Sequence, residues 1–216
     1  MYLSRVELNV YRRTTIGAIE SPQIMHAAVM ASFASDALNE RVMWRLDRIG
    51  AVTYLLVQSQ KRPDFRHIID QFGWPDSEQS YDTLEYDPFL DKLEPGQRWR
   101  FRLTANPTKS IKAADTSTRG KVVPHVTVDQ QVQWLIDKTP ERGFEIVASE
   151  DGVFNLDVVN REIKKFKRSD QNITLHLATF EGILEIKDDV QFKETITNGI
   201  GRAKGYGCGM LTIGRL

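Results

Sequence analysis

The chain has 216 residues, of which 41% are hydrophobic and 27% charged, and its formal net charge is zero. This length can supply the core of one large domain or of two small ones. No apolar run approaches the roughly 18 residues that a membrane helix needs, and no charged-then-apolar leader opens the sequence, so we expect a cytoplasmic protein without a membrane partner.

Cysteine and histidine usage limits the possible metal and disulfide chemistry. The single cysteine, Cys208, excludes an internal disulfide. The four histidines are scattered and show no pair at metal-ligand spacing: His26, His67, His125 and His176. We therefore expect neither a metal nor another cofactor.

The first half of the sequence has the periodicities of a βαββαβ unit. Apolar residues alternate with polar ones over 6–10, which predicts a strand. A helix is expected from Pro22, because proline suits the first helical position and Ser21 can cap it. The remaining expected elements are strands over 42–49 and 52–59, a helix over 65–72 that Gly73 ends, an acidic loop, and a strand over 98–103.

The second half repeats this order without visible sequence repetition. Thr127 and Gln130 have the spacing of a capping box ahead of an amphipathic helix. Strands are expected over 144–149, 172–186 and 208–213, and a short helix between Asp188 and Gly199. We therefore expect an α+β fold of two tandem ferredoxin-like domains, residues 1–110 and 111–216, joined within the stretch 106–121.

Charge is distributed in blocks, although the total is zero. Residues 74–94 carry a net charge of −6, residues 98–124 carry +6, and residues 161–168 carry +4. Each block alone is typical of a solvated face. Two basic blocks together indicate a polarised surface of the kind that binds the phosphates of a nucleic acid.

The end of the chain is rich in glycine. Five glycines and two cations, Arg202 and Lys204, fall within residues 199–209, ahead of a final apolar strand. Such a segment lets backbone N–H groups approach a phosphate closely. A dinucleotide-binding loop is disfavoured, because that motif follows a strand and opens a helix, whereas this segment follows a helix and leads into a strand.

Few residues suit catalysis. The sequence has no serine or cysteine nucleophile elbow, no metalloprotease motif, no phosphate-loop lysine and no acidic cluster of a two-metal nuclease. His26 lies beside the apolar stripe of its helix, where it can act as a proton shuttle or simply border the core. His125 is a weaker candidate, and His67 and His176 fit structural or solvated roles. RNA supplies its own nucleophile, the 2′-hydroxyl, so this inventory suits metal-free RNA cleavage.

Several segments in collinear order give the sequence a family resemblance. They are Met1–Val6, Met25–Ala28, Trp44–Leu46, Leu55–Ser59, Arg100–Lys109, Phe180–Gly182 and Gly199–Leu211. Together they resemble the CasE family, the CRISPR-associated endoribonucleases of the type I-E Cascade complex. The likeness spans nearly the whole chain.

This resemblance implies two tandem ferredoxin-like domains that recognise the stem-loop of a CRISPR repeat. It further implies metal-independent cleavage on the 3′ side of the stem, which leaves a 2′,3′-cyclic phosphate and a 5′-hydroxyl, and retention among the other Cascade subunits. The catalytic histidine of the family falls on His26. Gln23 stands where some relatives have a tyrosine, and Met30 or Ala31 stands near the place of a lysine. His26 is therefore expected to work with Gln23 or with a cation from elsewhere.

The resemblance also places the basic blocks on the RNA. Expected RNA-binding residues are Lys109, Lys112, Arg119 and Lys121 in the first block, Arg161, Lys164, Lys165, Lys167 and Arg168 in a hairpin pressed against the stem, and Arg202 and Lys204 in the glycine-rich segment. An alternative from another class is a non-catalytic RNA-binding scaffold of the same fold, in which His26 is structural.

Overall fold

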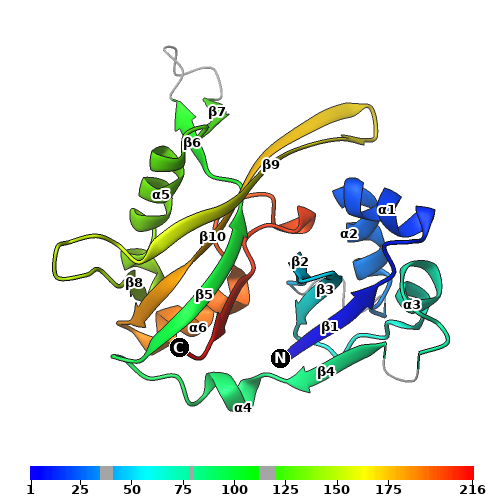
Figure 1. Ribbon diagram of the computed structural model, residues 1–216, viewed down its shortest axis with the longest axis horizontal. Helices are drawn as coiled ribbons and strands as arrows, with labels where there is room; N and C mark the ends of the chain where they lie inside the picture. The colour runs from blue at the N-terminus through cyan, green and yellow to red at the C-terminus, as the bar shows by residue number, and fades with distance from the viewer. Residues whose placement is uncertain (35–40, 78–79, 112–119) are drawn as a thin grey trace.

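The computed structural model describes residues 1–34, 41–77, 80–111 and 120–216, and its two larger antiparallel sheets are each covered by helices on one face (Figure 1). The first sheet has the order β2-β3-β1-β4. The elements of this half are β1 (Tyr2–Leu8), α1 (Arg13–Glu20), α2 (Pro22–Met30), β2 (Met43–Ile49), β3 (Val52–Ser59), α3 (Arg66–Phe72) and β4 (Tyr81–Glu85).

The second sheet has the order β11-β5-β10-β8, with β9 paired to β10, and β6 and β7 form a separate two-stranded sheet. Its elements follow α4 (Asp87–Leu90): β5 (Arg98–Ala105), β6 (Thr108–Ile111), β7 (Lys121–Pro124), α5 (Val128–Ile136), η2 (Pro140–Arg142), β8 (Phe144–Ile146), β9 (Leu156–Arg168), β10 (Gln171–Ile186), α6 (Asp189–Asn198), η3 (Lys204–Tyr206) and β11 (Leu211–Gly214). In both sheets the first and third strands of a βαββαβ unit are central, which confirms the expected tandem ferredoxin-like fold.

The structure differs from the expected order of elements in three places. The strand over 98–103 exists as part of β5, but it pairs with β10 and β11 in the second sheet. The fourth strand of the first sheet is β4, within the segment that we expected to be an acidic loop. The two sheets therefore divide the chain between β4 and β5, upstream of the expected boundary at residues 110 and 111. The basic run 161–168 also differs, because it lies in strand β9 rather than between strands.

Helix α1 was not expected, and tertiary hydrogen bonds explain its presence. Its sequence is polar, with two β-branched threonines that favour a helix weakly. The hydroxyl of Thr14 donates to the backbone oxygen of Gln71, and that of Thr15 donates to the backbone oxygen of Phe72. Contacts with α3 thus hold a segment whose own periodicity does not predict a helix.

The helices over 128–136 and 189–198 begin where the sequence predicts, and at each start a side chain makes a capping hydrogen bond. The capping box of α5 is present, with reciprocal bonds between Thr127 and Gln130. Asp188 caps α6 through the backbone N–H of Gln191 at 2.9 Å. Pro22 does begin α2, but the Ser21 side chain makes no capping hydrogen bond. None of the helices in the described ranges is long and apolar enough to cross a membrane.

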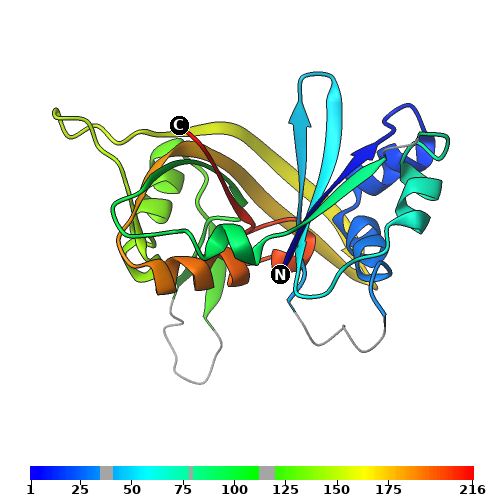
Figure 2. The same ribbon diagram turned by 90° about the horizontal axis from the view of Figure 1, so that it is seen from below.

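A buried arginine joins the two sheets. The Nε and Nη2 atoms of Arg45, on β2, donate to the carboxylate of Asp47 at 2.8 and 2.6 Å. Its Nη1 donates to the backbone oxygens of Arg102 on β5 and Met210 beside β11, at 2.9 and 2.8 Å. Figure 2 shows the two halves side by side, with β2 and β3 next to the second sheet. Arg45 thus fixes one half against the other.

Candidate functional site

His26 lies in the middle of α2, at the edge of the first core. Met25 and Val29 bury the inner face of the helix, and this leaves the imidazole half-buried. A Cβ atom placed on Gly205 would lie 3.5 Å from Cε1 of His26. The ring of Tyr206 meets the imidazole edge to face, with ring centroids 6.2 Å apart. Helix α2 and the glycine-rich loop (residues 199–209) therefore meet at His26.

The surroundings of His26 favour its neutral form. The Nδ1 atom is buried without a hydrogen-bond partner among the described residues. Burial lowers the pKa of His26 below its usual 6.5, and the positive charge of Arg168 lowers it further. The imidazole is therefore mostly neutral at pH 7, in the form that can accept a proton.

The β9–β10 hairpin reaches across to α1 and α2 (Figure 1). The Lys164 ammonium donates to the backbone oxygen of Ile19 at 3.0 Å and pairs with Glu162 at 2.9 Å. Phe166 meets Tyr206 edge to face, with ring centroids 4.9 Å apart. A strand of the second sheet is thus attached to the helices of the first half.

Alternation along β9 separates its cations onto two faces. Lys164, Phe166 and Arg168 share one face, and this face is directed toward the His26 site, because Phe166 contacts Tyr206 there. The other face carries Arg161, Lys165 and Lys167. Lys165, Lys167 and Arg168 are exposed near the tip of the hairpin.

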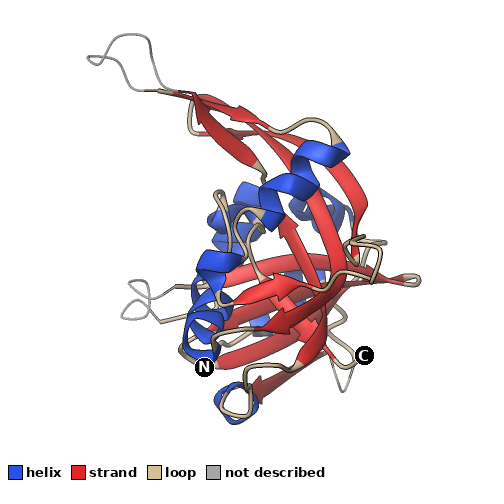
Figure 3. Ribbon diagram, turned by 90° about the vertical axis from the view of Figure 1, so that its left-hand side faces the viewer, coloured by secondary structure: helices blue, strands red, loops and turns tan. Residues whose placement is uncertain are grey.

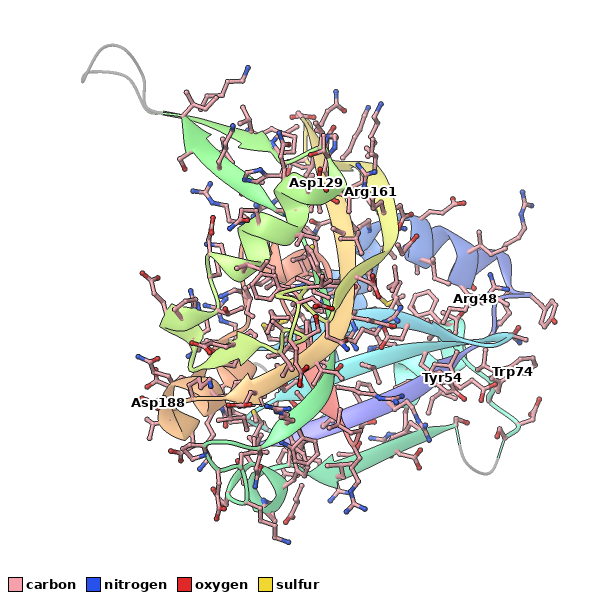
Figure 4. All side chains as sticks on the ribbon, turned by 60° about the vertical axis from the view of Figure 1, so that its left-hand side comes forward. Arg48, Tyr54, Trp74, Asp129, Arg161 and Asp188 are labelled. Carbon is pink, nitrogen blue, oxygen red and sulfur yellow. The ribbon has the colours of Figure 1, made fainter. Side chains whose placement is uncertain are left out.

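Two cations of the basic run have protein partners. The side chain of Lys164 is only 15% exposed because of its bonds to Ile19 and Glu162. Arg161 donates to the backbone oxygen of Val126, and Figure 4 shows it beside Asp129 at the start of α5. These two cations hold the hairpin to the body of the protein.

Two RNA-binding candidates of the first basic block lie on the small β6–β7 sheet, which projects from the body (Figure 3). Lys109 on β6 and Lys121 on β7 are exposed, while Lys112 and Arg119 lie outside the described residues. Arg202 is exposed and approaches Ser110 at 3.5 Å, so the glycine-rich loop and β6 are neighbours. Lys204 is half-buried, and burial followed by the charges of Arg41 and Arg142 lowers its pKa.

Most glycines of the loop serve packing rather than access to an anion. A Cβ on Gly199, which has φ +69°, would lie 2.2 Å from Cε of Met43. A Cβ on Gly207, which has φ +77°, would lie 2.8 Å from the Trp44 ring. These positions need glycine because β2 lies against them. Gly205 faces His26 instead, and the Trp44 indole N–H donates a hydrogen bond of 3.3 Å to the backbone oxygen of Gly205.

The site also contains residues on which sequence reasoning was less informative. Gln23 lies three residues before His26, on the same side of α2. Tyr206 was missed, although an aromatic residue within a glycine-rich loop is a signal for it. Cys208 is buried beside Phe166, and burial raises the pKa of its thiol to about 12.

The other histidines lie apart from this site. Nε2 of His67 lies 2.9 Å from the backbone oxygen of Ala28, which is a structural contact as expected. His125 follows β7, and burial and the charge of Lys109 lower its pKa. His176 lies within β10. No group of three or more His, Cys, Asp or Glu side chains in the described part of the chain is arranged to hold a metal ion.

Comparison with known sequences gives matches along the whole chain. A family model described as "CRISPR associated protein" matches residues 1–215. The chain is 30% identical over 223 residues to the CRISPR-associated endoribonuclease Cse3 of Thermus thermophilus, covering 99% of each chain. It is 25% identical over 185 residues to the CRISPR system Cascade subunit CasE of Escherichia coli, covering 81% of this chain and 89% of that one.

Solved structures resemble the fold just described. Thermus thermophilus Cse3 bound to an RNA representing a pre-cleavage complex superposes with a TM-score of 0.81 and 28% identity, over 99% of this chain and 98% of that one. The Escherichia coli protein Cas6e superposes with a TM-score of 0.67 and 23% identity over the full length of both chains, a likeness of fold alone.

Proposed function

This chain belongs to the CasE family of CRISPR-associated endoribonucleases, and we propose that it cleaves precursor CRISPR RNA at the repeat stem-loop to give mature guide RNA. The full-length match to an endoribonuclease whose RNA-bound structure superposes on this fold carries the proposal. The half-buried His26, beside an aromatic ring and an exposed hairpin of cations, supports it. The protein then acts in the cytoplasm, with the RNA hairpin and other Cascade subunits as partners.

In the proposed reaction, the neutral imidazole of His26 takes the proton from the 2′-hydroxyl of the nucleotide before the cut. The 2′-oxygen attacks the adjacent phosphorus, and the bond to the 5′-oxygen of the next nucleotide breaks. The products are a 2′,3′-cyclic phosphate and a 5′-hydroxyl, once the leaving oxygen has taken up a proton. This chemistry needs no metal, because the nucleophile belongs to the RNA and the protein supplies proton transfer and positive charge.

Positive charge around the site is proposed to hold the stem. Lys165 and Lys167 on one face of the β9–β10 hairpin and Arg168 on the other can contact phosphates on both strands of a groove. Lys109 and Lys121 on the β6–β7 sheet and Arg202 in the glycine-rich loop extend this surface. Such contacts fix the register of the RNA, whereas base contacts select its sequence.

The direct test is incubation of the purified protein with a labelled CRISPR-repeat stem-loop in EDTA, beside the same RNA with a 2′-deoxy nucleotide at the cut. We expect cleavage of the first RNA to a cyclic phosphate end and intact 2′-deoxy RNA, because the nucleophile is then missing. Tight binding of a cognate repeat without cleavage would instead favour the RNA-binding scaffold. Cleavage of the 2′-deoxy RNA would contradict the 2′-hydroxyl mechanism.

Salt dependence tests the cations of the hairpin. Changing Lys165 or Lys167 to glutamine should reduce the slope of log affinity against log salt by roughly 0.7 to 0.9 each, since one phosphate contact is lost. Lys164→Gln is the matched control on the same strand. Its ammonium already bonds to Ile19 and Glu162, so the slope should change less. If fluorescence anisotropy gives the same slope of log affinity against log salt for wild type and both exposed variants, these lysines do not contact phosphates of the RNA.

A further inference from the structure

We propose that Arg168 is a further catalytic residue, whose guanidinium contacts the phosphate at the cut and stabilises the negative charge that develops during attack. This inference rests on the proposed function. It goes beyond the general RNA-binding role of the hairpin, because it assigns Arg168 to the chemical step.

The reaction needs a cation that the helix of His26 does not provide. Helix α2 spans Pro22–Met30 and contains no lysine or arginine. Attack by the 2′-oxygen adds negative charge to the phosphate oxygens, and an enzyme without a metal stabilises that charge with positioned donors. The cation must therefore come from another element that packs against α2.

Strand β9 places Arg168 on the correct side. The Lys164 bond to Ile19 fixes this strand against the first half of the protein, and the contact of Phe166 with Tyr206 fixes it against the glycine-rich loop. Arg168 is the next residue on that same face of β9. Tyr206 in turn touches His26, so one row of contacts leads from the hairpin to the imidazole.

The electrostatics of His26 agree with this placement. Elements packed against α2 present several ionisable groups: Glu20 on α1, Glu162, Lys164 and Arg168 on β9, and Lys204 and Tyr206 on η3. Among the described residues, Arg168 is the one whose charge lowers the pKa of His26, after the larger effect of burial. Its guanidinium therefore lies within electrostatic reach of the imidazole.

Two other cations of the area are less suitable. Lys164 is bonded to protein oxygens. Arg202 is directed toward Ser110 on β6. Arg168 is exposed, always charged, and offers a planar set of donors that can bind a phosphate through two oxygens.

Arg168 can thus act both in the free protein and in the RNA-bound protein. Before RNA binds, the charge of Arg168 adds to the larger effect of burial in favouring the neutral form of His26, which is the form needed for a base. When the phosphate binds, its negative charge offsets that of Arg168, and the imidazole accepts a proton more readily. Substrate binding and base strength are coupled through this one guanidinium.

The experiment compares single-turnover cleavage by wild type, Arg168→Ala, Arg168→Lys and Lys167→Ala, each at saturating protein. Lys167 is the matched control, since it is the neighbouring exposed cation on the opposite face of β9. Arg168→Ala should lower the maximum rate by about 10²-fold, as loss of a transition-state donor does. Arg168→Lys should retain part of the rate, and Lys167→Ala should weaken affinity and lower the maximum rate far less than Arg168→Ala does.

A second readout is the NMR titration of His26 without RNA. Removal of the positive charge at residue 168 favours the imidazolium, so Arg168→Ala should raise the pKa of His26 toward 6.5, and Lys167→Ala should not. The acid limb of the pH–rate profile should move to higher pH in the same variant, because the neutral base is lost sooner as the pH falls.

Two results would overturn the inference. One is an unchanged maximum rate in Arg168→Ala, which would leave Arg168 as a binding residue only. The other is an unchanged titration of His26 in that variant. Neither result touches the proposed function, which fails only if the wild-type protein binds a cognate repeat and does not cleave it.

Discussion

Replacement of His26 with alanine is expected to slow cleavage of the repeat stem-loop by about 10²- to 10⁴-fold at saturating protein, the usual contribution of a general base. The affinity for uncleaved RNA should remain close to that of wild type, because the cations of the binding surface lie on other elements. Single-turnover kinetics measure the first quantity. Anisotropy with a 2′-deoxy RNA measures the second without interference from cleavage.

Gln23→Ala provides the comparison on the same helix. The amide of Gln23 cannot act as a general acid or base at neutral pH, so its removal should cost less in rate than removal of His26. If His26→Ala loses RNA affinity and thermal stability along with cleavage, His26 is a structural residue at the edge of the core. If the variant cleaves at the wild-type rate, the base is another group.

Arg45→Met is expected to lower the free energy of unfolding by about 3–5 kcal/mol, because it leaves the buried carboxylate of Asp47 without its main partner. The side chains of Arg45 and Asp47 are only 2% and 7% exposed. The backbone oxygens of Arg102 and Met210 also lose a donor in this variant. Urea unfolding monitored by circular dichroism measures the change.

Arg48→Met is the matched control on the same strand. Arg48 is exposed and donates to the backbone oxygen of Gly50 at 3.3 Å, so its loss should change stability by about 0.5 kcal/mol or less. The double variant Arg45→Met with Asp47→Leu should recover much of the loss, since no buried charge is left alone. Similar stabilities for the Arg45 and Arg48 variants would mean that the contact between the two halves does not depend on Arg45.

Local patterns predicted the helices better than the pairing of strands. The capping box at Thr127 and the proline at the start of α2 depend on neighbours in sequence, and both are present. The alternation over 98–103 correctly predicts a strand, but it is the same whichever sheet the strand joins. Phe101 and Leu103 are buried in the core of the second sheet. Their strand joins this sheet because it pairs with residues far along the chain.

The residues of the candidate site also differ in whether local sequence patterns predict them. His26 was accessible to sequence reasoning, because its place beside an apolar stripe and the family resemblance both depend on adjacent residues. The contact of Tyr206 with His26 joins segments far apart in the chain, which no local pattern indicates. Lys164 and Lys165 look equivalent in sequence, yet strand alternation gives one a carbonyl partner and leaves the other exposed.

The buried thiol of Cys208 has a practical consequence for following the hairpin in solution. A thiol reagent attacks the thiolate, and a group shielded from solvent with a pKa of about 12 presents almost none at neutral pH. The native protein should therefore behave toward maleimide dyes as though it contained no cysteine. Ser169→Cys, at the exposed tip of the hairpin, would then carry a single fluorophore, and its emission would report the binding of RNA to the hairpin in real time.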